Sequence, residues 1–212
     1  MLLAFDTSSP TVTVAVSDGA DVLVELTSAE TLRHGEQLTP LIDRALRQVG
    51  ITPRDLTAIA VGVGPGPFTG LRVGLVSART MAHVLEIPVY GVCSLDVLAV
   101  EAVDTGSVSG PFVVASDARR REVYLATYDE AGLRVSGPDV LRPADVATDQ
   151  PVVGEGAALY PDSFPDGRPP LRPGAGWLAR CVAEERAELR DPDPLYLRRP
   201  DAEIPRAPKP VS

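Results

Sequence analysis

The first 26 residues carry hydrophobic runs of strand length separated by turn residues. Residues 2–5 are a continuous apolar run, which is typical of a buried strand. Residues 11–17 alternate between apolar and polar side chains, so they predict a half-buried strand. Asp18 and Gly19 form a hairpin signal before a third strand at 21–26. Together these segments predict an antiparallel meander of three strands.

The hydrophobic period then changes to that of a helix. Residues 35–49 place six apolar side chains on one stripe: Leu38, Leu41, Ile42, Ala45, Leu46 and Val49. A buried strand at 58–63 and a glycine-proline loop follow, and a second helix is predicted at about 70–86. The chain therefore has the mixed pattern of an α/β protein.

The second predicted helix is apolar on two sides. One stripe holds Leu71, Leu75, Ala78, Ala82 and Leu85, and the other holds Val73, Val76, Thr80 and Val84. One stripe can cover a sheet, whereas the other needs a further partner because exposed apolar area costs about 25 cal/mol per Å². That partner is either another part of this chain or a second protein. The pattern does not decide between these alternatives, nor which stripe faces the sheet.

The second half of the chain repeats the order of the first, with strands before helices. After a strand at 87–92 and a helix at 94–103, a linker-like segment at 104–111 precedes the restart. The elements predicted beyond it are strands at 112–117, 122–128, 133–136 and 151–154 and a helix at 175–189. An acidic residue closes the first strand of each half, Asp6 and Asp117. We interpret this as a weak internal duplication.

Charge and composition exclude several classes of protein. The net charge of −9 argues against a stand-alone nucleic-acid binder, which usually has a basic face. Lys209 is the only lysine, so no internal lysine can form a Schiff base or serve a phosphate loop. Cys93 and Cys181 fit no metal or redox spacing and predict buried thiols in a reducing compartment. No segment has the length or apolar character of a membrane span, so we expect a cytoplasmic protein.

Two segments have residues that could hold a phosphate. Asp6-Thr7-Ser8-Ser9 follows a strand, where hydroxyls and turn amides can bind an anion and the aspartate can bind Mg²⁺ through water. The alternative, which we favour, is a turn capped by its own side chains. The glycine-rich loop of residues 62–74 joins a strand to a helix, but it lacks the spacing and the lysine of a P-loop. It is either an anion site or a rigid elbow at an interface.

The remaining candidates make no complete catalytic set. His34 and His83 have no histidine partner at helical spacing, which argues against a zinc site, and we expect His34 to cap the first helix or lie in an interface. No GxSxG nucleophile elbow is present. The charged segment 117–122 reads as a solvated hairpin turn.

Five segments together resemble the bacterial TsaB family, also called YeaZ. They are Asp6–Ser9, Arg33–Leu38, Gly64–Gly74, Asp117–Tyr124 and Pro194–Arg198, in the order of the family and over nearly the whole chain. The resemblance implies the actin-like ATPase (ASKHA) fold, with two ribonuclease H-like halves whose mixed sheets are flanked by helices. We place the halves at residues 1–105 and 106–200 and a mobile, proline-rich tail at 201–212.

The resemblance also implies a function. TsaB proteins are the non-catalytic partner of TsaD, which transfers a threonylcarbamoyl group to N6 of the adenosine next to the tRNA anticodon. A TsaE-like ATPase joins the complex, which uses ATP and Mg²⁺, whereas TsaB itself is expected to bind no cofactor or metal and to meet tRNA only through the complex. The HxxxH metal ligands of the catalytic relative are absent here. A stand-alone actin-fold ATPase or small-molecule kinase is the alternative; a metallopeptidase lacks its ligands.

In the family the first two helices contact TsaD, or a second TsaB when the protein is alone. This carries over to nine residues here: His34, Leu38, Leu41, Ile42, Ala45, Leu46, Val73, Val76 and Thr80. A vestigial phosphate loop would comprise Asp6, Thr7, Ser8, Gly64 and Gly66. The chain departs from the family with Pro67 and Gly35, where serine is usual. Pro67 lacks both a hydroxyl and a backbone N–H, which weakens the phosphate-binding interpretation of the loop.

Overall fold

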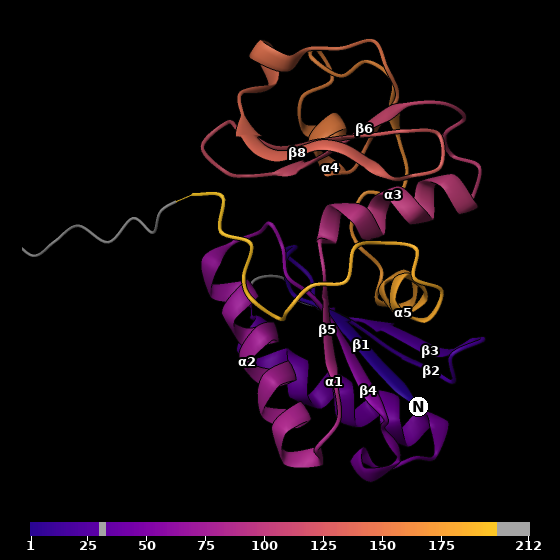
Figure 1. Cartoon of the computed structure of the whole chain (residues 1–212). Helices are drawn as coiled ribbons and strands as arrows, with labels where there is room; N and C mark the ends of the chain where they lie inside the picture. The colour runs from indigo at the N-terminus through magenta and orange to yellow at the C-terminus, as the bar shows by residue number, and fades with distance from the viewer. Residues whose placement is uncertain (30–32, 199–212) are drawn as a thin grey trace, which may run out of the picture.

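Two five-stranded sheets and the helices around them form the molecule (Figure 1). The structure is a computed structural model and describes residues 1–29 and 33–198. The predicted mobile tail at 201–212 lies outside the described residues. One sheet comes from the first half of the chain and the other from the second half, while the boundary at 105/106 stays a prediction.

The first sheet has the strand order β3-β2-β1-β4-β5. Its strands are β1 (Leu2–Asp6), β2 (Thr13–Ser17), β3 (Val22–Thr27), β4 (Ala58–Gly62) and β5 (Val89–Val92). The first three are antiparallel neighbours, which confirms the predicted meander, and β4 and β5 continue parallel to β1.

The second sheet repeats this topology. Its strands are β6 (Phe112–Asp117), β7 (Val123–Tyr128), β8 (Arg134–Leu141), β9 (Val152–Val153) and β10 (Gly167–Arg168), in the order β10-β9-β6-β7-β8. Counted within its own half, each sheet has the order 3-2-1-4-5, which confirms the internal duplication. The sequence pattern missed β10 and ended β8 too early at residue 136.

The helices separate the sheets into layers (Figure 1). Helices α1 (His34–Val49) and α2 (Phe68–Leu85) cover one face of the first sheet, and α3 (Ser94–Asp104) and α5 (Ala175–Ala183) lie between the two sheets. The short α4 (Glu155–Leu159), which the pattern did not predict, packs on the far face of the second sheet. Single 3₁₀ turns, η1 (Pro53–Asp55) and η2 (Pro143–Val146), complete the described elements.

Strand β2 is buried on both faces, which corrects the prediction of a half-buried strand. Its valines face α1, while Ala15 on the other side packs in one cluster with Ala175 and Leu178 of α5. Glu25 of β3 also holds the start of α5, because its Oε1 accepts a hydrogen bond from the Gly176 N–H at 3.0 Å. A helix from the far end of the chain thus completes the core of the first half. This helix ends at Ala183, six residues earlier than predicted.

Residues 190–198, here called the C-terminal strap, run along the edge of the first sheet and reach the second. Arg190 and Gly91 exchange two backbone hydrogen bonds of 2.8 and 2.9 Å. Further on, the Leu195 N–H donates to the Val63 carbonyl at 2.9 Å. The strap passes the N-terminal end of α2 in Figure 1 before the described chain ends.

Candidate functional site

The first candidate site is the turn after β1, where Asp6 is buried. Its Oδ1 accepts hydrogen bonds from the Ser8 N–H and the Ser8 hydroxyl, both at 2.6 Å, and its Oδ2 accepts one from the Ser94 hydroxyl at 2.6 Å. Burial raises the pKa of Asp6, and these hydrogen bonds oppose that rise because they stabilise the carboxylate. The turn is therefore capped by its own side chains, the interpretation that the sequence favoured.

The glycine-rich loop closes directly on this turn. A Cβ at Gly66 would lie 2.4 Å from the Ser8 carbonyl oxygen, and one at Gly70 would lie 2.4 Å from the Thr7 carbonyl oxygen. The Thr7 hydroxyl also donates to the Gly70 carbonyl at 2.8 Å. The glycines are needed because the two backbones touch here. The structure brings Asp6, Thr7, Ser8, Gly64 and Gly66 together, but as a rigid elbow whose inner space the chain itself fills.

His34 joins the first helix to the same turn. It is the first residue of α1 and is buried, and its Nε2–H donates to the Ser9 carbonyl at 2.7 Å. The ring also borders Gly70 at the start of α2. His34 thus ties α1, α2 and the Asp6 turn together, and it is not exposed to a partner.

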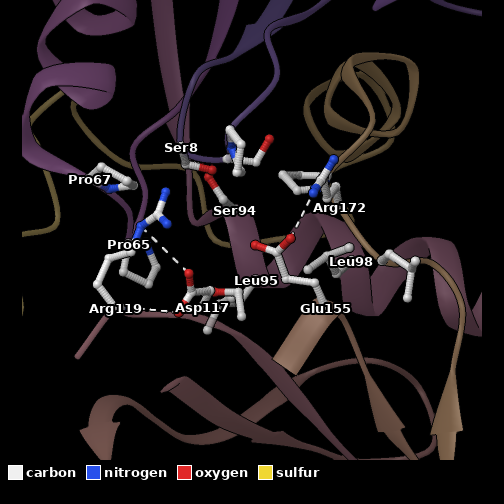
Figure 2. Close-up of a pocket in the computed structure, with 15 residues that line it drawn as sticks. Ser8, Pro65, Pro67, Ser94, Leu95, Leu98, Asp117, Arg119, Glu155 and Arg172 are labelled. Carbon is white, nitrogen blue, oxygen red and sulfur yellow. Dashed lines mark hydrogen bonds and ion pairs between the residues drawn. The ribbon is translucent and has the colours of Figure 1, made fainter. Parts of the chain in front are cut away.

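A cleft separates the two halves at the end of this elbow (Figure 2). Ser8, Pro65 and Ser94 line it from the first half, and ion pairs close it from the second: Arg119 with Asp117 at 3.5 Å and Arg172 with Glu155 at 3.0 Å. The enclosed space is about 20 Å³. One water molecule needs about 10–15 Å³ of such space, so these side chains leave room for one or two waters between them in this conformation.

The sequence did not single out Ser94, Glu155 or Arg172 as site residues. Ser94 is the first residue of α3 and follows the end of β5 by two positions, and a hydroxyl residue at such a strand-to-helix junction is the signal that could have identified it. Glu155 and Arg172 lie in segments without a clear hydrophobic period, so only the tertiary structure places them at the cleft.

A second polar cluster was also missed, around the buried Asp96 of α3. Tyr128 donates its hydroxyl proton to Asp96 Oδ1 at 2.8 Å, and the Arg134 guanidinium lies 3.0 Å from the same oxygen. Burial raises the pKa of Asp96, while Arg134 and Tyr128 lower it. The cluster joins α3 to β7 and β8. The signal for it was Asp96 itself, an acidic residue between the apolar residues Leu95 and Val97 near the start of α3.

The structure places the five α1 residues of the expected partner surface inside the chain. They pack against β2, β3 and α2 in the core of the first half: Leu38, Leu41, Ile42, Ala45 and Leu46. Leu41 is the most exposed of them at 7%, so a partner has no access to this stripe in this conformation. The stripe is apolar because it covers the sheet, which corrects its assignment to an intermolecular surface.

Helix α2 does present an exposed apolar stripe. Its other stripe, from Leu71 to Ala82, faces the sheet. Val76 is 60% exposed and Val84 is 71% exposed, with the exposed Thr80 between them and the half-buried Val73 at the inner edge. The structure thus decides which side of α2 is the core side. The outward side is called the α2 face below and comprises Val73, Val76, Thr80 and Val84.

The C-terminal strap extends the α2 face at its N-terminal end. The rings of Phe68 and Tyr196 stack with centroids 5.0 Å apart, and the Arg72 guanidinium lies 3.7 Å above the Phe68 ring. Arg72 Nε also donates to the Tyr196 hydroxyl at 3.3 Å, and Arg79 pairs with Asp193 of the strap. The segments Gly64–Gly74 and Pro194–Arg198, far apart in sequence, therefore meet at one place.

The turn between β6 and β7 has an unusual backbone. Arg119, Arg120 and Arg121 are consecutive and all left-handed, with φ of 62°, 57° and 61°. A non-glycine residue in this conformation costs roughly 1–2 kcal/mol. Arg198 of the strap supports the turn, because its Nη1 donates to the Ala118 carbonyl at 3.1 Å and its other amine pairs with Glu122. The predicted solvated hairpin is thus exposed but firmly held.

The two cysteines lie in the core. Both cysteines are free and buried, as predicted, and burial raises the pKa of each thiol to about 12. Within residues 1–29 and 33–198, no group of three or more histidine, cysteine or acidic side chains is placed to hold a metal ion. No helix in the same part of the chain has the length and apolar character needed to cross a membrane.

Comparisons with known proteins agree on one family. The family model described as TsaD, tRNA N6-adenosine threonylcarbamoyltransferase, matches residues 27–161, more than half of the chain. The uncharacterized protein Rv3421c of Mycobacterium tuberculosis is 43% identical over 95% of this chain and 93% of its own length. The tRNA threonylcarbamoyladenosine biosynthesis protein TsaB of Escherichia coli is 32% identical over 93% of this chain and 94% of its own length.

Solved structures give the same result. The solved structure of YeaZ from Pseudomonas aeruginosa superposes with a TM-score of 0.75 at 30% sequence identity, and the match covers 92% of this chain and 99% of that one. A second Pseudomonas aeruginosa structure, described as similar to peptidase YEAZ, superposes with a TM-score of 0.78 at 29% identity over 93% of this chain and 99% of its own. The two sheets of matching order identify the actin-like ATPase fold. On the evidence of sequence, topology and structure together, the chain belongs to the TsaB (YeaZ) family.

Proposed function

We propose that this chain is a non-catalytic subunit of the complex that adds a threonylcarbamoyl group to N6 of the adenosine beside the tRNA anticodon. In this proposal it binds and activates a TsaD-like catalytic subunit. The E. coli relative is named for the biosynthesis of this modification, and the family model that matches the chain bears the name of the transferase. A TsaE-like ATPase, ATP, Mg²⁺ and tRNA would join through the complex.

The exposed apolar stripe of α2 is the observation that carries this proposal. Val76 and Val84 leave apolar surface in water on the side of the helix that no other described element covers. Burying such side chains between two proteins contributes roughly 1.5–3 kcal/mol each. A helix face with a polar edge suits another helix, and the partner surface that we propose consists of the α2 face and the strap residues beside it.

The cleft supports the non-catalytic part of the proposal. An actin-fold kinase needs an acidic base facing its substrate and room for phosphates. Here both carboxylate oxygens of Asp6 are engaged with serines, and the glycine loop packs on the Thr7–Ser8 backbone. Asp117, at the equivalent end of β6, pairs with Arg119. No residue described at the cleft combines an available base with space for a substrate.

Co-purification with the TsaD-like subunit of the same cell tests the proposal. We expect the tagged chain to retain that subunit, Val76→Asp to reduce its recovery at least tenfold, and Val135→Asp to leave it unchanged. Val135 is a matched control because it is 70% exposed on β8, away from α2. Cells depleted of the chain should regain the modified adenosine with the control variant and not with Val76→Asp.

Two results would contradict the proposal. One is a folded wild-type chain that does not bind the TsaD-like subunit. The other is ATP turnover by the pure chain that Asp6→Ala abolishes, which would identify an ATPase or kinase instead.

A further inference from the structure

The C-terminal strap crosses from the first half of the chain to the second beside the cleft. In the first half, the Leu195 N–H donates to the Val63 carbonyl at 2.9 Å. In the second half, Arg198 Nη1 donates at 3.1 Å to the carbonyl of Ala118, which directly precedes the arginine turn between β6 and β7. Both carbonyls lie within two residues of a side chain that lines the cleft. The three peptide units from Leu195 to Arg198 reach at most about 11 Å, so a short segment ties the two halves together.

The anchor in the second half consists of more than one hydrogen bond. Arg198 also forms an ion pair with Glu122, and the two side chains are only 27% and 28% exposed. Partly buried ion pairs are screened less by salt than exposed ones. Leu195 packs both against the core of the first half and against the core between α3 and the second sheet, where Leu197 joins it. The second half therefore fixes the position of the strap as much as the first half does.

Between these anchors the strap carries Tyr196 to the N-terminal end of the α2 face. The Tyr196 ring stacks on Phe68, and its hydroxyl accepts a hydrogen bond from Arg72 Nε at 3.3 Å. Tyr196 is still 38% exposed, so part of its surface is accessible. The α2 face itself offers only valine and threonine side chains, whereas tyrosine is among the residues that contribute most to binding at protein interfaces. Tyr196 thus adds an aromatic side chain that the α2 face lacks.

We propose that Tyr196 contacts the catalytic partner together with the α2 face, and that the second half controls this contact by holding the strap. The inference rests on the proposed function and assigns Arg198 and Glu122 as positioning residues that act through Tyr196. When Arg198 holds the strap, Tyr196 is already in place for the partner. When that anchor is lost, binding must also order the strap, which weakens the affinity. A partner surface on the first half therefore depends on the second half, which has no catalytic task in the proposed function.

The test measures the affinity of the purified chain for the TsaD-like subunit by titration calorimetry. Tyr196→Ala removes the proposed contact, and Arg198→Ala removes only the anchor behind it. Arg168→Ala is the matched control, because Arg168 also pairs with a carboxylate, that of Asp166, but lies on β10 at the edge of the second sheet. Arg198→Lys is the conservative variant, since it keeps a positive charge opposite Glu122.

A second measurement reports directly whether the strap is seated. The Leu195 N–H is bonded to the Val63 carbonyl, so its rate of hydrogen exchange should rise when the strap is released. Arg198→Ala should raise this rate, and the Arg168→Ala control should not. The measurement needs no partner, so it separates the seating of the strap from the binding of the TsaD-like subunit.

We expect Tyr196→Ala to weaken binding about tenfold and Arg198→Ala about fivefold, while the control matches wild type. Arg198→Lys should recover part of the affinity that Arg198→Ala loses. The double variant should bind no more weakly than Tyr196→Ala alone, because Arg198 acts through Tyr196. A residue that contributes only to stability would not produce this non-additive result.

A folded Tyr196→Ala chain that binds like wild type overturns the inference and leaves the proposed function intact. A double variant that loses the affinity of both single variants combined also overturns it, because Arg198 would then act independently of Tyr196. Glu122→Gln provides a second way to release the anchor if Arg198→Ala folds poorly. Rapid Leu195 exchange with unchanged affinity in that variant has the same meaning. A wild-type chain that does not bind the TsaD-like subunit overturns both the inference and the proposed function.

Discussion

The hydroxyl of Ser94 donates a 2.6 Å hydrogen bond to Oδ2 of Asp6 and so joins the end of β1 to the first turn of α3. Both side chains are buried. The contact is close enough that a Cβ on Gly62, which lies between them, would be 1.8 Å from the same carboxylate oxygen. Residue 62 must therefore be glycine for the bond to form. This pair holds the elbow on which α2 and the cleft are built.

Ser94→Ala should lower the free energy of unfolding by about 1–3 kcal/mol, because it leaves a buried carboxylate oxygen without its partner. Ser107→Ala is the control, since the Ser107 hydroxyl bonds only with the Thr105 hydroxyl at the surface, and a change there should stay within about 0.5 kcal/mol. Urea denaturation measures both. Equal effects of the two variants would show that the Ser94–Asp6 bond contributes nothing special.

Gly66→Ala and Gly70→Ala should each destabilise the chain by about 1–3 kcal/mol, because the new methyl group would meet the Ser8 or Thr7 carbonyl oxygen. Gly35→Ala should have the opposite sign. Gly35 is the second residue of α1, and its nearest Cβ contact is an ordinary 3.9 Å to Val73, so alanine should stabilise the helix by up to about 0.5 kcal/mol, less than at an interior position. Thermal melts distinguish the two directions. A neutral Gly66→Ala would mean that the loop and the Asp6 turn can separate at little cost.

Tyr196→Ala should destabilise the folded chain by about 1–2 kcal/mol, since it removes the ring stacked on Phe68 and the partner of Arg72. Tyr196→Phe keeps the stack and loses only the hydroxyl contact, so it should cost less than about 1 kcal/mol. The melting temperatures of both variants test whether the strap is docked in solution. If Tyr196→Ala melts like wild type, the strap adds nothing to the stability of α2.

Leu41→Asp and Val76→Asp should separate the core side of the helices from the α2 face. Leu41 is buried, so a carboxylate there should prevent folding or cost at least about 3 kcal/mol. Val76 is 60% exposed, and its change should alter stability by no more than about 0.5 kcal/mol. Circular dichroism of the two pure variants measures the difference. If the Leu41→Asp variant folds, the apolar stripe of α1 is again a candidate for contact with a partner.

Stability should fall as the pH rises from about 4.5 to about 7 because of Glu101, and this contribution should level off above pH 7. Burial, with the Glu25 carboxylate nearby, raises the pKa of Glu101 to about 7 from its ordinary 4.5. Between these values the folded chain holds a proton that the unfolded chain has lost, so raising the pH favours unfolding. Glu101→Gln should therefore stabilise the chain at pH 8 by about 1 kcal/mol. This is less than the free energy equivalent to the whole rise in the pKa, because Glu101 is partly exposed to solvent.

Denaturation midpoints at pH 5, 7 and 8 measure this dependence. Glu130→Gln, on the exposed turn before β8, is the control and should keep the wild-type dependence. The interpretation is wrong if Glu101→Gln follows the wild-type curve at every pH.

The hydrophobic periodicity of the sequence predicted the helices and strands well, but it did not predict which surface each of them packs against. The apolar stripe of α1 was correctly located and wrongly assigned to a partner interface, because a stripe of apolar residues does not say whether a sheet or another protein buries it. The two stripes of α2 are similar in hydrophobicity, so only the packing shows that Leu75 faces inward and Val76 outward. The sequence left the glycine loop as either an anion site or a rigid elbow, because the backbone that packs against it lies about 60 residues earlier in the chain.

The sequence by itself determined the α/β pattern, the repeated order of strands and helices, the buried thiols and the five motif segments that identify the family. These follow from periodicity and residue type over short stretches, which local chemistry controls. Only the tertiary structure decided that α5 buries the second face of β2, that Ser94 holds Asp6, and that the strap joins α2 to the arginine turn. Each of these contacts joins residues about 80 or more positions apart, because the free energy of folding comes from burying surfaces that the chain brings together only when it is folded.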